Sequence, residues 1–483
     1  MSLKIHNTLT GTIDKFIAID PKRVTMYSCG PTVYNYPHIG NWAAYIYWDT
    51  LVRILLANDF KIDRVMNVTD VGHLTSDADE GEDKMAKSAR AEGKTAWDVA
   101  KFYTEDFING MNGLGLIMPE HLAKVTNYIP QQFDLIRALK KKGVTYQIND
   151  GIYYDTSKFP TYADFAHLNL DAQKAGARVE FNPEKHSSSD FSLWKFSPLN
   201  EKRDMEWETP CDIMDDDEKG RMGFPGWALE CSTLALYILG NTIDIHTGGI
   251  DHVPVHHTNE IAQSEAATGV RFSNYWLHNN HIKINGTKIS KSLGNGYTLK
   301  DLTDKGFSPL DLRMLVLQGH YRSEGNFTFE SLEAAKNRRN NWRNIAALRH
   351  QIHSTQNPDA EETLPSFAIS QAIIEAVDED LGTPQALAII DEAFKQIVAQ
   401  PIDSMNQSAL VQMIETIDSI LGLQLIKTTP DISDDAKMII IERRQARDQK
   451  DWKKSDHLRD KLIEQGIIIR DTEKNSIWEY KNI

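Results

Sequence analysis

Near the start of the chain, short apolar segments typical of buried strands alternate with longer segments in which apolar residues recur at helical spacing. Residues 23–27 predict a short buried strand, and apolar positions at helical spacing predict an amphipathic helix over 39–58. Residues 64–70 predict a second buried strand, and helical spacing returns over 96–114. Strands that alternate with helices in this way predict an α/β fold with a doubly wound, Rossmann-like parallel sheet.

This alternation stops between residues 119 and 225. Residues 126–142 keep helical spacing, and residues 143–155 predict two strands joined by an Asn-Asp-Gly turn. We therefore expect an inserted α+β connective domain over 119–225. The four consecutive acidic residues at 215–218 do not suit a single ion, so we interpret them as an exposed acidic loop.

Residues 226–330 restore the α/β pattern. The β-branched residues at 241–246 predict a strand, the glycine-rich residues 247–251 predict a turn at its carboxyl end, and residues 256–262 predict the start of a helix. The α/β domain is therefore expected in two halves, 1–118 and 226–330, on either side of the insertion.

Helical spacing dominates the last third of the chain. Segments 331–355, 367–400 and 404–422 predict an antiparallel helical bundle over 331–430, and residues 431–483 predict a small C-terminal domain. The first of these segments carries a run of basic residues, which are Lys336, Arg338, Arg339, Arg343 and Arg349.

Composition and charge narrow the class of protein. The 483 residues are 41% hydrophobic, with no apolar run long enough to cross a bilayer and no signal-peptide core at the start. Three cysteines make no disulfide framework, so we expect a cytoplasmic protein. A net charge of −15 weakly disfavours nucleic acid, yet residues 437–464 hold nine Lys and Arg against six Asp and Glu.

Polar side chains gather where the first strand gives way to the first helix. Cys29 follows the strand, and His38 and Asn41 lie at the helix N-terminus, where unpaired N–H groups attract phosphate. Gly40 lets a ligand approach the backbone closely. A proline-kinked loop with a capping Asn remains an equal alternative on this stretch alone.

Four further side chains have the chemistry of metal ligands. His256 and Glu260 are four residues apart and share one helical face. Adding Cys29 and Cys231 gives two sulfurs, one nitrogen and one oxygen, which suits Zn²⁺. Because the two cysteines are 202 residues apart, spacing alone leaves ordinary surface or core roles open.

Lys288 and Lys291 lie on a loop between Gly286 and Gly294. The flanking glycines permit hinge motion, and paired lysines can follow charge on a phosphate chain. A solvated basic turn is the structural alternative.

Taken together, these motifs resemble those of a known family. His38-Ile39-Gly40-Asn41 and Lys288-Ile289-Ser290-Lys291-Ser292 resemble the two signatures of class I aminoacyl-tRNA synthetases. The cysteinyl-tRNA synthetases have a similar set at Cys29, 227–231 and 256–260, and the resemblance continues at 190–195, 319–323 and 447–456. It covers nearly the full chain.

The chain departs from the family pattern at a few positions. Asn41 and Ala228 stand where histidine is common, and Ile289 replaces methionine. Thr258 breaks the usual His-His-Glu-Asn-Glu, and residues 208–222 look like an added loop. The proposed metal ligands and lysines are all kept, so Ala228 is the departure that bears on the details of the amino-acid pocket.

The resemblance implies a cysteine–tRNA ligase activity in two steps. L-cysteine and ATP, with Mg²⁺, give cysteinyl-adenylate, and the 3′ end of tRNA(Cys) then accepts the cysteine. The implied catalytic residues are His38, Asn41, Lys288 and Lys291, with Gly40, Gly249 and Asp251 also binding ATP. A monomer is expected.

The resemblance also implies how cysteine is selected and how tRNA is bound. One zinc ion per chain, held by Cys29, Cys231, His256 and Glu260, would bind the substrate thiolate, which a serine hydroxyl cannot match. The implied substrate contacts are Cys29, Thr32, Trp227 and His246. The C-terminal domain would bind the anticodon, with implied tRNA contacts at Arg447, Trp452, Asp456 and Asp471, and Trp478 is also available to stack on bases.

Two other functions stay open. A related ligase could join activated cysteine to a small amine, but it would not need the C-terminal third. A non-catalytic zinc-containing RNA-binding protein would need neither signature loop.

Overall fold

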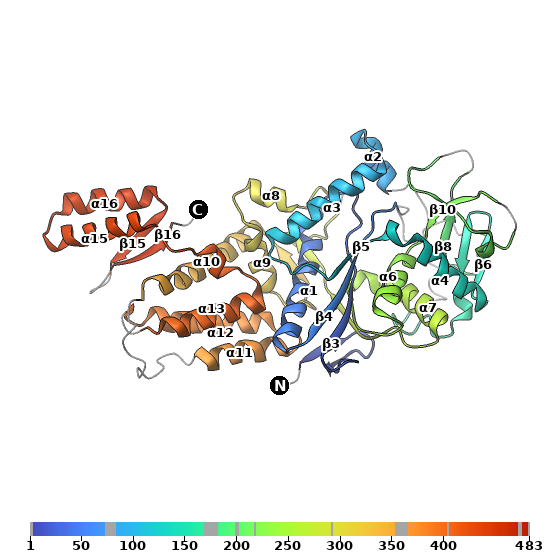
Figure 1. Cartoon of the computed structure of the whole chain (residues 1–483), viewed down its shortest axis with the longest axis horizontal. Coiled ribbons are helices and arrows are strands. Elements are labelled where there is room, and N and C mark those ends of the chain that lie inside the picture. Colours follow the sequence, from blue (N-terminus) through green and yellow to red (C-terminus); the bar gives the residue numbers. More distant parts are fainter. Residues whose placement is uncertain are drawn as a thin grey trace.

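A parallel five-stranded sheet forms the centre of the computed structural model (Figure 1). Its order is β12-β11-β3-β4-β5, from β3 (Arg23–Ser28), β4 (Lys61–Val68), β5 (His121–Lys124), β11 (Ile243–Gly249) and β12 (Ser273–Asn279). The structure describes residues 3–72, 84–168, 182–198, 202–216, 219–290, 293–352, 366–402, 405–471 and 476–481. The predicted α/β fold with a parallel sheet is confirmed.

Helices cover both faces of this sheet. On one face, Met26 of β3 packs in the same core as α1 (Ile39–Ala57). On the other, the next residue, Tyr27, packs with α3 (Ala96–Gly113) and α6 (Leu229–Leu239), because successive side chains of a strand point to opposite faces. The helices predicted over 39–58 and 96–114 are confirmed, and α2 (Lys84–Glu92) precedes the second of them.

The region predicted as an insertion contains a second, antiparallel sheet. Its order is β6-β7-β8-β10-β9, from β6 (Thr145–Ile148), β7 (Gly151–Tyr154), β8 (Phe191–Phe196), β9 (Trp207–Glu208) and β10 (Met222–Pro225). Helix α4 (Ile129–Lys141) packs in the same core. The two strands predicted over 143–155 are confirmed, and Asp215 and Asp216 of the acidic loop are exposed.

The central sheet continues beyond the boundary predicted at residue 118. Strand β5 (His121–Lys124) pairs in parallel with β4, with Val65 opposite His121. The chain therefore adds the edge strand of the central sheet before it enters the second sheet.

Four helices form the bundle of the C-terminal third. They are α10 (Phe329–Ala347), α11 (Ser366–Asp378), α12 (Thr383–Val398) and α13 (Gln407–Leu421). The segment predicted as helical over 367–400 is interrupted, because Asp380 and Leu381 have positive φ values of 54° and 56°. Asp380 is held there by tertiary contacts, since Tyr321 Oη donates a hydrogen bond to its Oδ1 (2.6 Å).

Three arginines of the predicted basic run, Arg338 and Arg339 on α10 and Arg349 in the turn after it, form contacts within the protein. Arg339 forms a buried ion pair with Asp311 (2.7 Å), and Arg338 pairs with Asp391 (2.5 Å). Arg349 Nη2 donates a hydrogen bond to the carbonyl of Thr429 (2.7 Å). These residues fasten the bundle to its neighbours.

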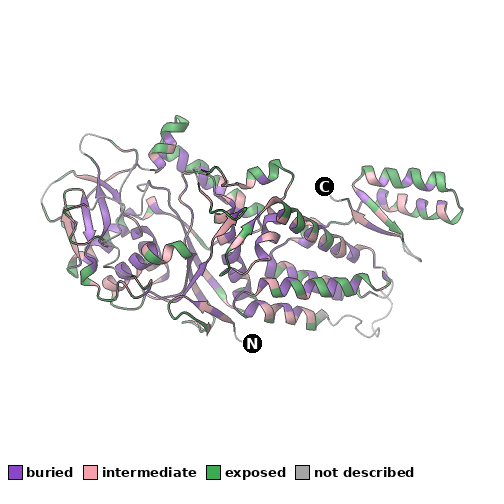
Figure 2. Cartoon of the chain, turned by 180° about the vertical axis from the view of Figure 1, so that it is seen from behind, coloured by how far each residue is buried: buried purple, intermediate pink, exposed green. Residues whose placement is uncertain are grey.

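The C-terminal module consists of two helices and a hairpin, and its helices have largely exposed outer faces (Figure 2). Its elements are α15 (Asp434–Asp448), α16 (Trp452–Glu464), β15 (Ile467–Asp471) and β16 (Ser476–Tyr480). Trp478 is buried in the core of this module and its N–H donates to Gln351 Oε1 (2.9 Å). The prediction that Trp478 is available to stack on bases is therefore wrong.

Shorter elements connect these parts. They are β1 (Lys4–Asn7), β2 (Thr12–Lys15), α7 (Thr258–Thr268), β13 (Ile282–Ile284), α8 (Leu299–Asp304), α9 (Pro309–Leu317), β14 (Gly325–Phe327) and α14 (Leu425–Thr428). Within the described ranges, the helices are all too short or too polar to cross a membrane.

A buried ion pair joins the α/β domain to the bundle. Asp49 on α1 faces Arg313 on α9, and both side chains are at most 1% exposed. Arg313 also donates to the carbonyls of Leu421 (2.6 Å) and Leu114 (3.1 Å). One guanidinium therefore connects α1, α9, α13 and the end of α3.

We expect Asp49→Ala to destabilise the protein by about 3–5 kcal/mol, because it leaves the Arg313 charge buried without its partner. Urea denaturation followed by circular dichroism measures the change in the free energy of unfolding. Glu379→Ala is the matched control: it removes the exposed Lys4–Glu379 pair and should cost at most about 1 kcal/mol. Equal effects of the two substitutions would contradict the role given to Asp49.

Candidate active site and metal centre

Parallel pairing of β3 with β11 brings two distant segments to one edge of the sheet. Ile245, His246 and Thr247 lie opposite Met26, Tyr27 and Ser28. The pairing continues past β3, where the N–H of Cys29 donates to the carbonyl of Thr247 (3.2 Å). Both strands therefore end at the edge where open α/β sheets bind ligands.

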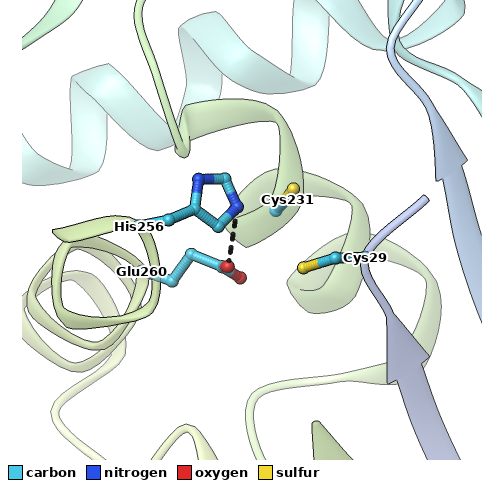
Figure 3. Close-up of side chains that lie close together, drawn as sticks. All are labelled: Cys29, Cys231, His256 and Glu260. Atoms are coloured by element: carbon cyan, nitrogen blue, oxygen red, sulfur yellow. Dashed lines mark ion pairs between the residues drawn. The ribbon is translucent and has the colours of Figure 1, made fainter. Parts of the chain in front are cut away.

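The four predicted metal ligands meet at this edge (Figure 3). The ligand atoms of Cys29, Cys231, His256 and Glu260 all lie within 4.8 Å of one another. Cys29 follows β3, Cys231 lies on α6, and Glu260 lies on α7. His256 lies in a π-helical turn, Val253–His257, so α7 begins two residues later than predicted.

The cluster combines two buried thiols with a buried, negatively charged carboxylate. Burial raises the pKa of both thiols, and that of Cys231 lies well above its usual range. Burial would also raise the pKa of Glu260, but His246 and His256 outweigh this and lower it to about 2. Glu260 Oε1 has no hydrogen-bond partner among the described residues, although His256 Nε2 lies 3.1 Å away. Two thiols, an imidazole and this oxygen fit a divalent ion.

Two histidines that were not predicted as metal ligands, His257 and His278, form a hydrogen-bonded pair next to the cluster. His257 Nε2 lies 3.3 Å from Cys29 Sγ, and His257 Nδ1 is hydrogen-bonded to His278 Nε2 (2.7 Å). The other nitrogen of His278 bonds Thr8 Oγ1 (2.7 Å). His257 also belongs to a second possible ligand set, with Cys29, His246 and Glu260. The adjacent pair His256-His257 was the sequence signal for this second set.

The predicted substrate-binding residues separate into two groups. Trp227 lies beside the cluster, with its ring 5.2 Å from that of His256, and Thr32 is half-buried in the loop after β3. His246 is completely buried, stacks on Trp276 and bonds Glu260 Oε2 (2.8 Å). Its position suits orientation of Glu260 rather than the predicted contact with substrate.

Ala228 starts α6 in a conformation that is unusual for alanine. Its φ is 71°, its side chain is completely buried, and it makes no side-chain cap. A β-carbon in the left-handed region is strained, so the surrounding packing must hold it there. The next turn of α6 carries Cys231, and the position of this metal ligand depends on that start.

The first signature loop forms a closed cap on α1. The Asn41 N–H donates to His38 Nδ1 (3.2 Å), and the His38 N–H donates to Asn41 Oδ1 (3.1 Å). This capping box holds both side chains at the positive end of the helix dipole. The structure therefore confirms the capping role that the sequence left open.

The second signature loop packs against the first. Ile289 lies so close to Gly40 that a β-carbon at residue 40 would be 3.0 Å from Ile289 Cδ1. The Ile39 N–H also donates to the carbonyl of Tyr297 (2.8 Å). Lys288 is exposed, whereas Lys291 lies outside the described residues.

The turn predicted at 247–251 begins later than expected. Strand β11 runs to Gly249, and a 3₁₀ turn, Ile250–His252, follows it. A β-carbon at Gly249 would lie 2.4 Å from Asp251 Oδ1, so the exposed Asp251 side chain lies over the end of β11. Gly249 and Asp251 thus form one unit at the end of β11.

Comparisons with known proteins identify the family of this chain. Residues 15–337 match the model for the catalytic domain of class I tRNA synthetases (C), and residues 429–478 match the cysteinyl-tRNA ligase anticodon binding domain. A cysteine–tRNA ligase of Treponema denticola is 40% identical, over 99% of this chain and 100% of that protein. One from Burkholderia lata is 40% identical over 98% of this chain and 96% of its own length.

The chain belongs to the cysteine–tRNA ligase family. Solved structures show the fold at lower identity. A Mycobacterium tuberculosis methionyl-tRNA synthetase in complex with methionyl-adenylate matches 84% of this chain and 91% of its own, at 14% identity and a TM-score of 0.57. A putative arginyl-tRNA synthetase from Campylobacter jejuni matches 84% of this chain and 93% of its own, at 11% identity and a TM-score of 0.51.

The cluster predicts that the purified protein retains a divalent metal. We expect Cys231→Ser to lower the metal content strongly, because it removes one of two sulfur ligands from a buried site. Plasma mass spectrometry of dialysed protein measures metal per chain. Cys211→Ser is the control, since Cys211 is exposed and outside the cluster. Equal metal retention by both variants would contradict the assignment.

Proposed function

We propose that this chain activates L-cysteine with ATP and transfers it to the 3′ end of tRNA(Cys). The observation that carries the proposal is the convergence of two sulfur ligands, a histidine and a carboxylate at the end of β3, where the first signature loop begins. The described part of the second signature loop packs against the first, where Ile289 meets Gly40. Each part serves one requirement of the reaction: selection of a thiol, binding of phosphates, and access for a second substrate.

His38 and Asn41 are proposed to bind the phosphates of ATP. Attack by the cysteine carboxylate on the α-phosphate spreads negative charge over its oxygens, and donors must meet that charge. The capped start of α1 offers the positive end of the helix dipole. Lys288 and Lys291 would neutralise the departing pyrophosphate, and Mg²⁺ would accompany ATP.

Cys29, Cys231, His256 and Glu260 are proposed to hold one zinc ion. When bound, zinc supplies a soft Lewis acid that prefers the thiolate of cysteine to the hydroxyl of serine. The chain's own residues preorganise this site, because His246 orients Glu260 and His257 contacts Cys29. Thr32 and Trp227 would line the remainder of the amino-acid pocket.

Gly249 and Asp251 are proposed to contact the ribose of ATP. The exposed Asp251 carboxylate lies close to Gly249, at the end of β11. Carboxylates at the ends of such strands accept hydrogen bonds from ribose hydroxyls.

The C-terminal module is proposed to bind the anticodon. Trp452 is exposed, with the Arg447 guanidinium 5.9 Å from its ring, so both can reach RNA. Asp471 forms ion pairs with Arg443 and Arg447. The hydrogen bond from Arg443 is the main reason why the pKa of Asp471 is lowered to about 2. Asp471 therefore suits positioning of Arg447 rather than direct contact, and Asp456 pairs with Arg459 (3.2 Å).

A small-amine ligase is disfavoured because the match to the anticodon binding domain covers residues 429–478. A non-catalytic RNA-binding protein is disfavoured by the packing of the two signature loops. A monomeric, cytoplasmic enzyme remains our expectation.

Pyrophosphate exchange with each of the twenty amino acids tests the activation step. We expect exchange with cysteine and at least about 10²-fold less with serine, because a hydroxyl is a poor zinc ligand. Exchange by Cys231→Ser should fall, whereas Cys211→Ser should match the wild type. Cysteine-independent exchange, or equal use of serine, would refute the proposal.

Two tryptophans of the C-terminal module should respond oppositely to substitution. Trp452→Ala should weaken tRNA aminoacylation by about 1–3 kcal/mol, if Trp452 stacks on a base, and leave the melting temperature unchanged. Trp478→Ala should instead destabilise the module by about 3–5 kcal/mol, since Trp478 is buried. Aminoacylation kinetics and thermal denaturation separate the two effects. Normal aminoacylation by a folded Trp452→Ala protein would exclude base stacking there.

A further inference from the structure

A cavity of about 190 Å³ lies beside the first signature loop, between α3, the start of α1 and α8. Its lining includes Tyr36, Trp42, Asp106, Asn109, Gly113 and Lys300. It shares no residue with the proposed zinc, ATP or cysteine sites. Pockets for drug-sized ligands enclose roughly 300–1,000 Å³, so this cavity suits a smaller group.

The cavity adjoins the proposed reaction site. Tyr36 and Pro37 line it and directly precede His38, and Thr298 lines it and forms a backbone bridge with His38. A group bound here would therefore contact the residues next to His38, which is proposed to bind phosphate.

The polar lining of the cavity has the chemistry of base recognition. Asp106 and Asn109 are three residues apart on α3 and share a helical face. Among the described residues, neither side chain forms a hydrogen bond or an ion pair with the protein. A carboxylate accepts from an exocyclic amino group, and an amide can both donate and accept at a base edge.

The aromatic lining suits stacking. Tyr36 is 37% exposed, and its ring is held edge-to-face by Tyr103 (centroids 5.0 Å apart) and Phe102 (6.1 Å). Fixed aromatic rings with an exposed face are the usual platforms for unpaired bases. Lys300 lines the cavity and, within the part of the chain that the structure describes, is bonded to the exposed Asp304 (2.6 Å), a partner that it can exchange for a phosphate.

We propose that this cavity binds one unpaired nucleobase with an exocyclic amino group, from the single-stranded acceptor end of tRNA. The base would be a cytosine next to the terminal adenosine that receives cysteine. Binding it here would hold the 3′ end against the first signature loop. The inference rests on the proposed aminoacylation of tRNA and adds a subsite to it.

The first test changes the base and its partner together. In tRNA transcripts, each of the two cytosines before the terminal adenosine is replaced in turn by uridine, which lacks the amino group. At one position the wild-type enzyme should lose about tenfold in kcat/KM for tRNA. Asp106→Asn should reduce this preference, because an amide can face either base. Glu105→Gln, exposed on the same helix and outside the cavity, should keep it.

The second test fills the cavity without changing its charge. A β-carbon at Gly113 would meet only Pro309, at 3.5 Å, so larger side chains can enter there. Gly113→Leu should raise KM for tRNA by about tenfold or more, whereas Gly113→Ala should stay close to the wild type.

Cysteine-dependent pyrophosphate exchange distinguishes a failure of the proposed function from a failure of the proposed cavity site. Absence of exchange in the wild type would refute the proposed function itself. If exchange and aminoacylation proceed, but Asp106→Asn keeps the full preference for cytosine and Gly113→Leu keeps the wild-type KM, the cavity does not bind the acceptor end. Equal loss of exchange and aminoacylation in Gly113→Leu would likewise overturn the inference, since the variant would then act through the fold.

Discussion

The parallel pairing of β3 with β11 is the constraint on which the active site depends. It places Cys29 beside Thr247 although 218 residues separate them in the chain. The same pairing sets the distance from β3 to the turn that carries His256, and α6 packs behind both strands. A shift of one residue in this register would turn every side chain of β3 to the opposite face of the sheet.

Buried charge is handled in two ways in this protein. Asp49 is satisfied entirely within the chain, by Arg313, Arg53 and the backbone N–H of Ile117. The cluster around Glu260 is only partly satisfied: His246 bonds one carboxylate oxygen, while Oε1 has no hydrogen-bond partner among the described residues and makes ion-pair contacts with His256 (3.1 Å) and His257 (3.8 Å). The first arrangement stabilises the fold, and the second has the incomplete coordination expected of a ligand site.

The basic residues likewise divide into buried ones that bond within the protein and accessible ones. Arg339 and Arg349 on the bundle are buried and bonded to the protein, so they cannot bind RNA as they stand. Arg447 and Trp452 are accessible at the end of the C-terminal module. The cavity beside Tyr36 extends the possible RNA contacts to the opposite end of the substrate, next to the reaction site.

The amino-acid sequence by itself determined the parallel α/β fold, because alternating strand and helix periods leave few alternatives. It also determined the four candidate metal ligands, through their chemistry and the resemblance of their motifs to a known family. The tertiary structure decided the strand pairing, burial and side-chain partners, which the spacing of residues along the chain does not encode. It assigned β5 to the central sheet, buried Trp478, paired the arginines of α10, and placed His246 behind Glu260. Burial and partner choice depend on residues far apart in the chain, and only packing brings those residues together.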